Sequence, residues 1–265
     1  MSDTLQIPSM AEMAAKGESP EILFWVGCAG SFDQRAQKIT LAFAKILQAA
    51  NIKFAVLGKE ENCTGDPARR AGNEFAFQML ALNNIAILNG YNIKKVVTTC
   101  PHCFNILKNE YKELGGDYEV MHHSEFLTQL LNDGKIEIKE GNPFADKKIT
   151  YHDSCYLGRG NGIYEAPRQI LEKLKGEIIE MKRSRENGFC CGAGGAQMFK
   201  EEEAGDIRVN FERSNEAINT GVNIISSACP FCMTMLSDGV KNEEKEAQIK
   251  VLDLAEIVAS ANDLI

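Results

Sequence analysis

The sequence lacks the features that define several common classes of protein. None of its apolar runs reaches the roughly 18 residues that a membrane-spanning helix needs. The N-terminal segment MSDTLQIPSMAEMAAKGESP has no apolar core behind a basic start, so we expect no secretory signal. Basic residues are in the minority, 29 against 37 acidic ones, and the net charge of -8 argues against nucleic acid or an anionic membrane as the main partner. Hydrophobic residues at 44% and charged residues at 25% are ordinary values, which argues against disorder, collagen or a coiled coil.

Cysteine is the residue type that stands out. The chain has nine cysteines, an odd number that cannot pair completely within one chain. Because no secretory signal is expected, we predict a cytoplasmic, reducing compartment, where structural disulfides are rare. Clustered thiols in such a compartment indicate metal or redox chemistry. The nine are Cys28, Cys63, Cys100, Cys103, Cys155, Cys190, Cys191, Cys229 and Cys232.

The cysteine spacing reveals an internal repeat. Cys63 follows Cys28 by 35 positions, and Cys190 follows Cys155 by the same number. Each half ends in a C-x-x-C motif within similar sequence, VVTTCPHCFNIL in one half and IISSACPFCMTML in the other. The repeat has a period of about 128 residues. We therefore predict a flexible leader over 1–20, a first domain over 21–145 and a second domain over 146–265.

Apolar runs and segments of helical spacing alternate along both halves. The expected strands are 22–27, 53–57, 94–99, 148–153, 177–181, 223–228 and 249–252. The expected helices are 33–50, 67–90, 101–114, 164–175, 200–219, 230–240 and 253–262. This order predicts an α/β fold of two tandem, pseudo-twofold related domains with parallel sheets flanked by helices. Most cysteines follow a strand, so we expect them at the carboxyl ends of the strands, where open α/β sheets bind ligands.

Several kinds of site could use these thiols. Isolated cysteines are often small core residues, but nine in two matching registers are poorly explained that way. The Cys100–Cys103 motif at a helix start would suit a thioredoxin-like dithiol, which leaves seven cysteines unexplained. A structural zinc takes four ligands, mostly from two close pairs, whereas the second half offers five thiols. A four-iron cluster takes thiolates from separate directions, and one C-x-x-C motif with distant cysteines supplies them.

The second half resembles the cysteine-rich CCG domain, through the pattern Cys155, Cys190-Cys191-Gly192, Cys229 and Cys232. The chain is similar to the catalytic subunit of heterodisulfide reductase. It is also similar to the iron–sulfur subunits of lactate-utilisation, glycerol-3-phosphate and glycolate oxidoreductases, a family in which two tandem copies are usual. The resemblance implies that these five cysteines bind a noncubane 4Fe-4S cluster, with Cys190 and Cys191 closest to catalysis.

The first half departs from the CCG pattern at one position. Thr64 stands where the second cysteine of the motif would be. The resemblance then implies a conventional cubane 4Fe-4S cluster, or a modified or lost one. Because disulfide reduction in the family uses two noncubane clusters, the departure favours electron transfer. The remaining ligands of the first copy are Cys28, Cys63, Cys100 and Cys103.

The surrounding motifs, ENCTGDPARRAGNEF and YHDSCYLGRGNGIYEAPR among them, are similar to soluble parts of membrane-associated iron–sulfur oxidoreductases. The resemblance implies electron transfer from a dehydrogenase or electron-transfer flavoprotein to a quinone. Its implied partner is a ferredoxin-type or haem-binding membrane subunit, which would hold this cytoplasmic chain at the inner membrane. Two alternatives stay open, a thiol/disulfide reductase of the heterodisulfide reductase kind and a structural zinc scaffold.

Residues beside the cysteines could tune such a site. Gly192 and Gly194 are expected to let the backbone approach a cluster closely and to aim N–H groups at its sulfur. The four histidines could form structural hydrogen bonds or supply protons. Two of them, His122 and His123, follow a further predicted strand and are expected near the same edge. The four are His102, His122, His123 and His152. Three arginines could bind an anionic substrate or partner, or could simply be solvated at the surface. They are Arg159, Arg183 and Arg185.

Overall fold

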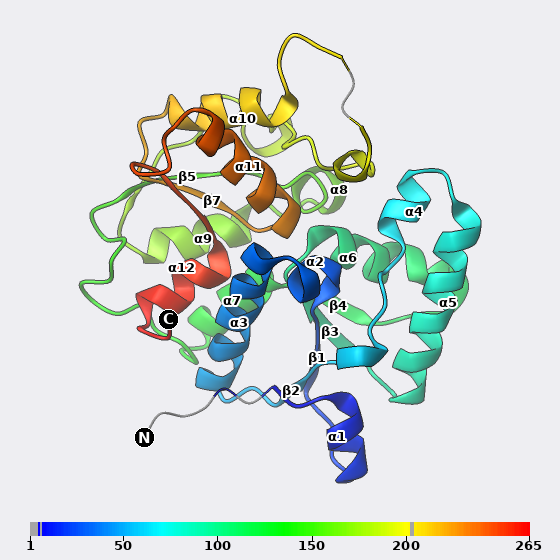
Figure 1. Cartoon of the computed structure of the whole chain (residues 1–265). Coiled ribbons are helices and arrows are strands. Elements are labelled where there is room, and N and C mark those ends of the chain that lie inside the picture. The colour runs from blue at the N-terminus through cyan, green and yellow to red at the C-terminus, as the bar shows by residue number, and fades with distance from the viewer. Residues whose placement is uncertain (1–4, 6, 202–203) are drawn as a thin grey trace.

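The computed structural model describes residue 5 and residues 7–201 and 204–265. The described strands form two four-stranded parallel sheets, in the orders β2-β1-β3-β4 and β6-β5-β7-β8 (Figure 1). The first sheet contains β1 (Ile22–Trp25), β2 (Phe54–Ala55), β3 (Lys95–Thr98) and β4 (Glu119–His122). The second contains β5 (Lys148–Tyr151), β6 (Glu177–Ile178), β7 (Ile224–Ser227) and β8 (Lys250–Asp253). The predicted α/β fold with two related parallel sheets is confirmed.

The two sheets correspond strand for strand. The central strands β1 and β7 are buried at every position, as expected for parallel strands covered on both faces. In the first sheet Thr98 at the end of β3 pairs with His122 at the end of β4. In the second sheet Ser227 and Asp253 form the matching pair between β7 and β8. The strand predicted before His122 is therefore present and is equivalent to β8.

Helices connect the strands and cover the sheets. The described α-helices are α1 (Met10–Ala15), α2 (Gly27–Phe32), α3 (Gln34–Ala49), α4 (Asp66–Arg70), α5 (Glu74–Gly90), α6 (Pro101–Asn105), α7 (His123–Asn132), α8 (Gly158–Asn161), α9 (Glu165–Lys173), α10 (Val209–Ile218), α11 (Pro230–Asn242) and α12 (Leu254–Ala261). Shorter turns are the 3-10 segments η1 (Gly58–Glu60), η3 (Tyr111–Leu114), η4 (Arg185–Asn187) and η5 (Gln197–Phe199) and the π-helical η2 (Ile106–Glu110). In this described part of the chain, no helix is both long and apolar enough to cross a lipid bilayer.

Three of the expected helices differ from the structure. The helix predicted over 67–90 is two helices, because Gly72 takes a left-handed φ of +84° and Asn73 caps α5 by accepting the N–H of Ala76. The helix predicted over 101–114 begins at Pro101 but continues as η2 and η3. Of the prediction over 200–219, only α10 is α-helical among the described residues, and residues 202–203 lie outside them.

One hydrophobic cluster runs through both halves, and each sheet has a further cluster of its own. Helices α3 and α12 lie side by side, as do α7 and α9, between the two sheets (Figure 1). Phe24 and Phe43 from the first half belong to the same buried cluster as Tyr151 from the second. Arg35 adds a bidentate ion pair to Glu256, with N–O distances of 2.7 and 2.6 Å. Because the core crosses from one half to the other, the division at residue 145 remains a prediction.

The segment that we expected to be a flexible leader, 1–20, contains helix α1. Ser9 and Glu12 form a reciprocal capping box at its N-terminus. Met10 and Met13, three positions apart on one helical face, are buried in the core of the first sheet. Ser9 also pairs with Val56 beyond the end of β2. The described part of this segment is therefore folded onto the first domain, which differs from the loose leader that we expected.

Candidate metal centres

The cysteines follow the two central strands of each sheet. In both sheets the chain leaves these strands toward opposite edges, and such a switch point opens a crevice at the carboxyl ends of the strands. Cys28 lies in α2, directly after β1, and Cys100 is the N-cap of α6, after β3. Cys155 and Cys229 have the same places after β5 and β7. The predicted placement of cysteines at the carboxyl ends of strands is confirmed.

The four thiols of the first copy share one pocket. Cys28 hydrogen-bonds Cys63, and Cys103 hydrogen-bonds Cys100. The pocket lies between the loops after β1 and β2 and the start of α6. Its lining includes all four cysteines together with Thr64, His102 and Phe231. The structure thus brings together the ligands predicted for the first copy.

The five thiols of the second copy also converge. Cys190 is hydrogen-bonded by Cys155 and by Cys191. The Sγ atoms of Cys191 and Cys232 lie 3.3 Å apart, and Cys232 also hydrogen-bonds Cys229. Cys155 and Cys190 are half-buried, whereas the other three are buried. This copy therefore presents five sulfurs from three separate loops.

Thr64 occupies the place of Cys191 in the first copy. Thr64 is buried, and its Oγ1 lies 3.9 Å from the Sγ of Cys103. Cys191 lies in the same relation to Cys232, which is the matching last cysteine of the second C-x-x-C motif. The first copy therefore offers four thiols and a hydroxyl where the second offers five thiols.

A glycine follows the cysteine loop in both copies and binds the sulfur through its backbone. Gly65 donates its N–H to the Sγ of Cys63 at 3.5 Å, and Gly192 donates to the Sγ of Cys190 at 3.3 Å. Both glycines have a left-handed φ, +91° and +93°. Residues with a Cβ adopt such a φ only with strain. Glycine therefore lets the backbone N–H reach the sulfur without that strain. Gly194 is less constrained, because a Cβ there would meet the Sγ of Cys155 at 4.0 Å, an ordinary contact.

Matching contacts join the cysteine loops of each copy. In the first copy the Glu61 carboxylate accepts the N–H groups of Val26 and Gly27, at 3.1 and 2.5 Å. In the second copy the Arg159 guanidinium donates to the carbonyl of Gly188. Each contact connects the loop after the first strand to the loop that carries the next cysteine. Sequence reasoning missed Glu61, although its place two residues before Cys63 was a usable signal.

Hydrogen bonds between thiols lower the pKa of Cys63 and Cys100 in the first copy and of Cys190 in the second. The hydrogen bond from Cys28 outweighs burial and lowers the pKa of Cys63 to about 6. In the second copy, hydrogen bonds from Cys155 and Cys191 hold the pKa of Cys190 well below its usual value. The thiolate is the metal-binding form of cysteine, so a lowered pKa favours metal binding at these sulfurs.

The donor sets fit iron–sulfur ligation better than zinc. All nine cysteines are free thiols. Four of them, on three separate segments of the chain, surround the first-copy pocket, as suits a four-iron cluster. The five thiols of the second copy exceed what a tetrahedral zinc accepts. Both copies therefore suit an iron–sulfur group held by their cysteines.

The two sites face one another. His102 lies between the cysteines of the first C-x-x-C motif, and Phe231 lies between those of the second. Their rings meet edge to face, with centroids 5.1 Å apart. Tyr156, directly after Cys155, packs on the other side of His102 at 4.3 Å. The two sites are adjacent, because Phe231 of the second copy forms part of the wall of the first-copy pocket.

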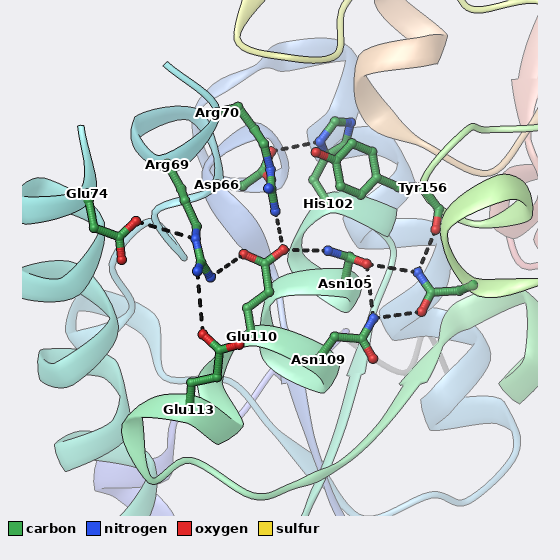
Figure 2. A network of polar contacts seen from close by, with 11 residues as sticks. Asp66, Arg69, Arg70, Glu74, His102, Asn105, Asn109, Glu110, Glu113 and Tyr156 are labelled. Carbon is green, nitrogen blue, oxygen red and sulfur yellow. Dashed lines mark hydrogen bonds and ion pairs between the residues drawn. The ribbon is translucent and has the colours of Figure 1, made fainter. Parts of the chain in front are cut away.

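A polar network surrounds His102 (Figure 2). The Asp66 carboxylate lies 2.9 Å from the Nδ1 of His102 and 3.0 Å from Arg70. Arg70 in turn pairs with Glu110, which also accepts from Asn105 on the same helical segment as His102. Burial disfavours a charge on His102, but the hydrogen bond to Asp66 and the negative charges of Cys100 and Asp66 together raise the pKa of His102. Sequence reasoning named His102 and missed Asp66, which lies in the Cys63 loop.

His122 and His123 lie at the carboxyl edge of the first sheet, as expected, and His122 contacts the backbone of Thr99 and Ala228, directly before Cys100 and Cys229. Both are fully buried, and His123 contacts His122 at 3.3 Å and Asp253 at 2.9 Å between ring and side-chain atoms. Asp253 ends β8, so this chain of side chains joins equivalent positions of the two sheets. Burial and the neighbouring ring hold the pKa of His122 well below its usual value. These residues connect the two halves by hydrogen bonds.

The arginines that we considered for anion binding are paired within the chain. Arg183 pairs with Glu212 and Glu216, at 2.8 Å each, and lies over the ring of Phe189. Arg185 pairs with Glu165. Arg159 donates to the Gly188 carbonyl. In these contacts all three arginines stabilise the loops of the second copy.

The arrangement defines a repeated, cysteine-lined centre at the carboxyl ends of two related sheets. Two segments of the chain, residues 22–108 and 149–237, match the cysteine-rich CCG domain. The matched segments contain all nine cysteines and make up more than half of the chain. The chain therefore belongs to the CCG cysteine-rich domain family.

Three relatives illustrate what the chain is similar to. It is 48% identical to "Probable iron-sulfur-binding oxidoreductase FadF" of Bacillus subtilis (strain 168), over 97% of this chain and 36% of the relative. It is 44% identical to "EtfAB:quinone oxidoreductase" of Syntrophomonas wolfei, over 92% and 35%. It is 36% identical to one subunit of the "Dihydromethanophenazine:CoB--CoM heterodisulfide reductase" of Methanosarcina barkeri, over 92% and 59%. The chain thus spans between about a third and three fifths of the length of these relatives, which are oxidoreductases by name.

Proposed function

We propose that the chain is an iron–sulfur oxidoreductase subunit that passes electrons through two adjacent clusters. The observation that carries this proposal is the contact between His102 and Phe231, 5.1 Å between ring centroids, because each residue lies between two cysteine ligands of its own copy. Iron–sulfur groups supply one-electron transfer at potentials set by their surroundings. The chain contributes the thiolates, the N–H groups of Gly65 and Gly192, and a closely packed wall between the sites.

The two copies would hold different clusters. Four thiols in the first copy, with the Thr64 hydroxyl in place of a fifth, support a cubane 4Fe-4S cluster. Five thiols in the second copy support the noncubane 4Fe-4S cluster that the CCG resemblance implies. Cys190 and Cys191 would be the ligands closest to the chemistry of this cluster, since they bring two adjacent sulfurs to one site. Gly192 and Gly194 would pack beside this cluster.

The relatives support a place in a larger electron-transfer complex. One is named for electron transfer between EtfAB and quinone, and a further relative, 42% identical, is a "Probable membrane-anchored ferredoxin" of Chromohalobacter salexigens. We propose electron-transfer flavoprotein or a dehydrogenase as donor and quinone as final acceptor. A ferredoxin-type or haem-binding membrane subunit would then be the partner, with this chain on the cytoplasmic side of the inner membrane.

A second candidate is a thiol/disulfide reductase. The complete five-thiol set of the second copy and the heterodisulfide reductase relatives favour it. Against it stands Thr64, which deprives the first copy of the fifth sulfur. We therefore rank electron transfer first.

The test uses chain purified without oxygen and mixed in a stopped-flow spectrometer with reduced electron-transfer flavoprotein. We expect the visible iron–sulfur absorbance to bleach, with no thiol released from added CoB–CoM heterodisulfide. The Cys103→Ser and Cys232→Ser variants, altered at equivalent positions, should each lose part of this absorbance. Thiol release as fast as the bleaching would favour the reductase, and stoichiometric zinc without iron would refute both functions.

A further inference from the structure

A histidine ring forms part of the wall of the second-copy site. His152 is 1% exposed and lies three residues before Cys155, just beyond the end of β5. One of its ring nitrogens and the Sγ atoms of Cys191 and Cys232 all lie within 4.8 Å of one another. This grouping could indicate a third metal ligand or a hydrogen-bond donor to sulfur, and the other ring nitrogen distinguishes the two.

The partner of His152 fixes which nitrogen carries the proton. The Nε of Arg213 donates to the Nδ1 of His152 at 2.9 Å. A guanidinium has donors only, so Nδ1 must be an acceptor without a hydrogen. In a neutral imidazole the hydrogen then lies on Nε2. Burial and the positive charge of Arg213 lower the pKa of His152 to about 3, which agrees with a neutral ring.

The Nε2–H of His152 has no partner within the described part of the chain. It is buried, and neither a carbonyl nor a carboxylate accepts from it. A buried donor without an acceptor is unfavourable, so native proteins rarely leave one without a reason. With Nδ1 occupied by Arg213, Nε2 is the nitrogen available to the neighbouring sulfurs. Since it bears a hydrogen, it suits donation to sulfur and does not suit metal ligation.

Arg213 is itself held in place. Its guanidinium is fully buried, donates to the Arg183 carbonyl at 2.8 Å and pairs with Glu216 at 2.9 Å. These contacts orient the Arg213 Nε toward His152. No local sequence pattern indicates this role, because Arg213 lies within a helix far along the chain from both cysteine loops.

We propose that His152 is a positioning residue that donates its Nε2–H to sulfur of the iron–sulfur group in the second copy and thereby raises its reduction potential. Hydrogen bonds to sulfur stabilise the more negative, reduced form of such a group. Arg213 sets the tautomer and is the outer member of the pair. The inference rests on the proposed function, since it requires a redox-active group at Cys191 and Cys232.

The first copy offers a matched position for comparison. Trp25 ends β1 three residues before Cys28, as His152 precedes Cys155, and the strand register places both beside the matching strands β3 and β7. The Trp25 ring is fully buried, and its Nε1–H also has no partner among the residues described. Trp25→Phe therefore removes an equivalent ring N–H from the other copy.

The experiment compares the wild type with His152→Leu, His152→Gln and Trp25→Phe, all as full chains purified without oxygen. Iron and sulfide are counted, and the second-copy signal is titrated by EPR against potential. We expect His152→Leu to keep its iron and to shift the one-electron reduction equilibrium about tenfold toward the oxidised form, about 59 mV lower. His152→Gln, whose amide can accept from Arg213 and donate to sulfur, should stay near the wild-type value. Trp25→Phe should leave the second-copy potential unchanged.

The outcomes separate the two proposals. A wild-type chain without iron and sulfide would refute the proposed function and this inference with it. A loaded His152→Leu chain with the wild-type potential would refute the inference alone. Should His152→Leu fail to fold, nitrogen-15 NMR of the wild-type apoprotein decides, since a hydrogen on Nε2 of His152 supports the donor role and a hydrogen on Nδ1 overturns it.

Discussion

The first and second copies have the same framework and differ in the residues that close their sites. At the position of Cys191 the first copy has Thr64, and at the position of His152 it has Trp25. The framework contacts are shared, above all the glycine N–H groups on Cys63 and Cys190. Two duplicated sites can therefore keep one ligand geometry and still diverge in the number of sulfurs and in the polarity of their walls.

The largest effect should come from removing one ligand from either copy. Cys232→Ser should abolish the cluster of the second copy and leave about half of the iron, because each four-iron group depends on its own thiolates. The matched variant Cys103→Ser should leave the other half. Iron and acid-labile sulfide per chain measure both. Loss of all the iron in either variant would show that the two sites are not independent.

A second difference is the support of the loop after the first strand. In the second copy Asp153 is buried and paired with Arg168 at 2.8 Å, whereas the matching residue of the first copy is Val26. Arg168→Met leaves the Asp153 carboxylate buried without its partner and should cost about 3–5 kcal/mol in the free energy of unfolding. Urea unfolding of the apoprotein measures this.

Arg69→Met provides the control in the first copy. Arg69 is half-buried and pairs with Glu110 at 2.7 Å and with the exposed residues Glu74 and Glu113 at 3.4 and 3.5 Å (Figure 2). Partly exposed pairs contribute about 0–1 kcal/mol, so this variant should change stability little. Equal losses in Arg168→Met and Arg69→Met would contradict the difference that we draw between the copies.

A smaller effect concerns His122, whose counterpart in the second copy is Asp253. The pKa of His122 is lowered in the folded chain, so only the unfolded chain gains its proton as the pH falls. Its contribution to stability is thus present above the unfolded pKa of about 6.5 and is lost below it, by up to about 1.4 kcal/mol per pH unit. His122→Gln should flatten the pH dependence of urea unfolding between about pH 6.5 and 5. Parallel curves for the variant and the wild type would show that His122 does not carry this dependence.

The smallest expected change makes the copies more alike. Thr64→Cys places a fifth thiol where the Thr64 hydroxyl lies 3.9 Å from Cys103, as Cys191 lies beside Cys232. A swap of nearly equal volume should alter stability by less than about 1.5 kcal/mol. We expect the iron count to stay the same and the EPR signal of the first copy to approach that of the second. An unchanged signal would mean that Thr64 does not determine the cluster type.

Much of the fold follows from local pattern, and much of the site does not. The strands before Cys28, Cys100, Cys155 and Cys229 were predictable because a short apolar run ends within a few residues of each cysteine. Arg213 was not, because its partner His152 is distant in sequence and becomes a neighbour only when α10 packs against β5.

A local signal also misled in one place, and in another it left the contacts open. The break between α4 and α5 depends on a single left-handed glycine within an otherwise helical pattern. His122 and His123 follow a strand and reach the predicted edge, but their burial and the contact of His123 with Asp253 depend on how the two halves pack. Sequence pattern assigns a residue to a strand end, and the packing of the two halves decides what it meets there.

The central claim is that both copies hold an iron–sulfur group in adjacent sites. The most direct measurement is the number of iron, acid-labile sulfide and zinc atoms per chain in protein purified without oxygen. Two four-iron groups predict about eight irons per chain with sulfide and no stoichiometric zinc. About four irons would contradict the two-site relay, and zinc in place of iron would contradict redox function in this chain altogether.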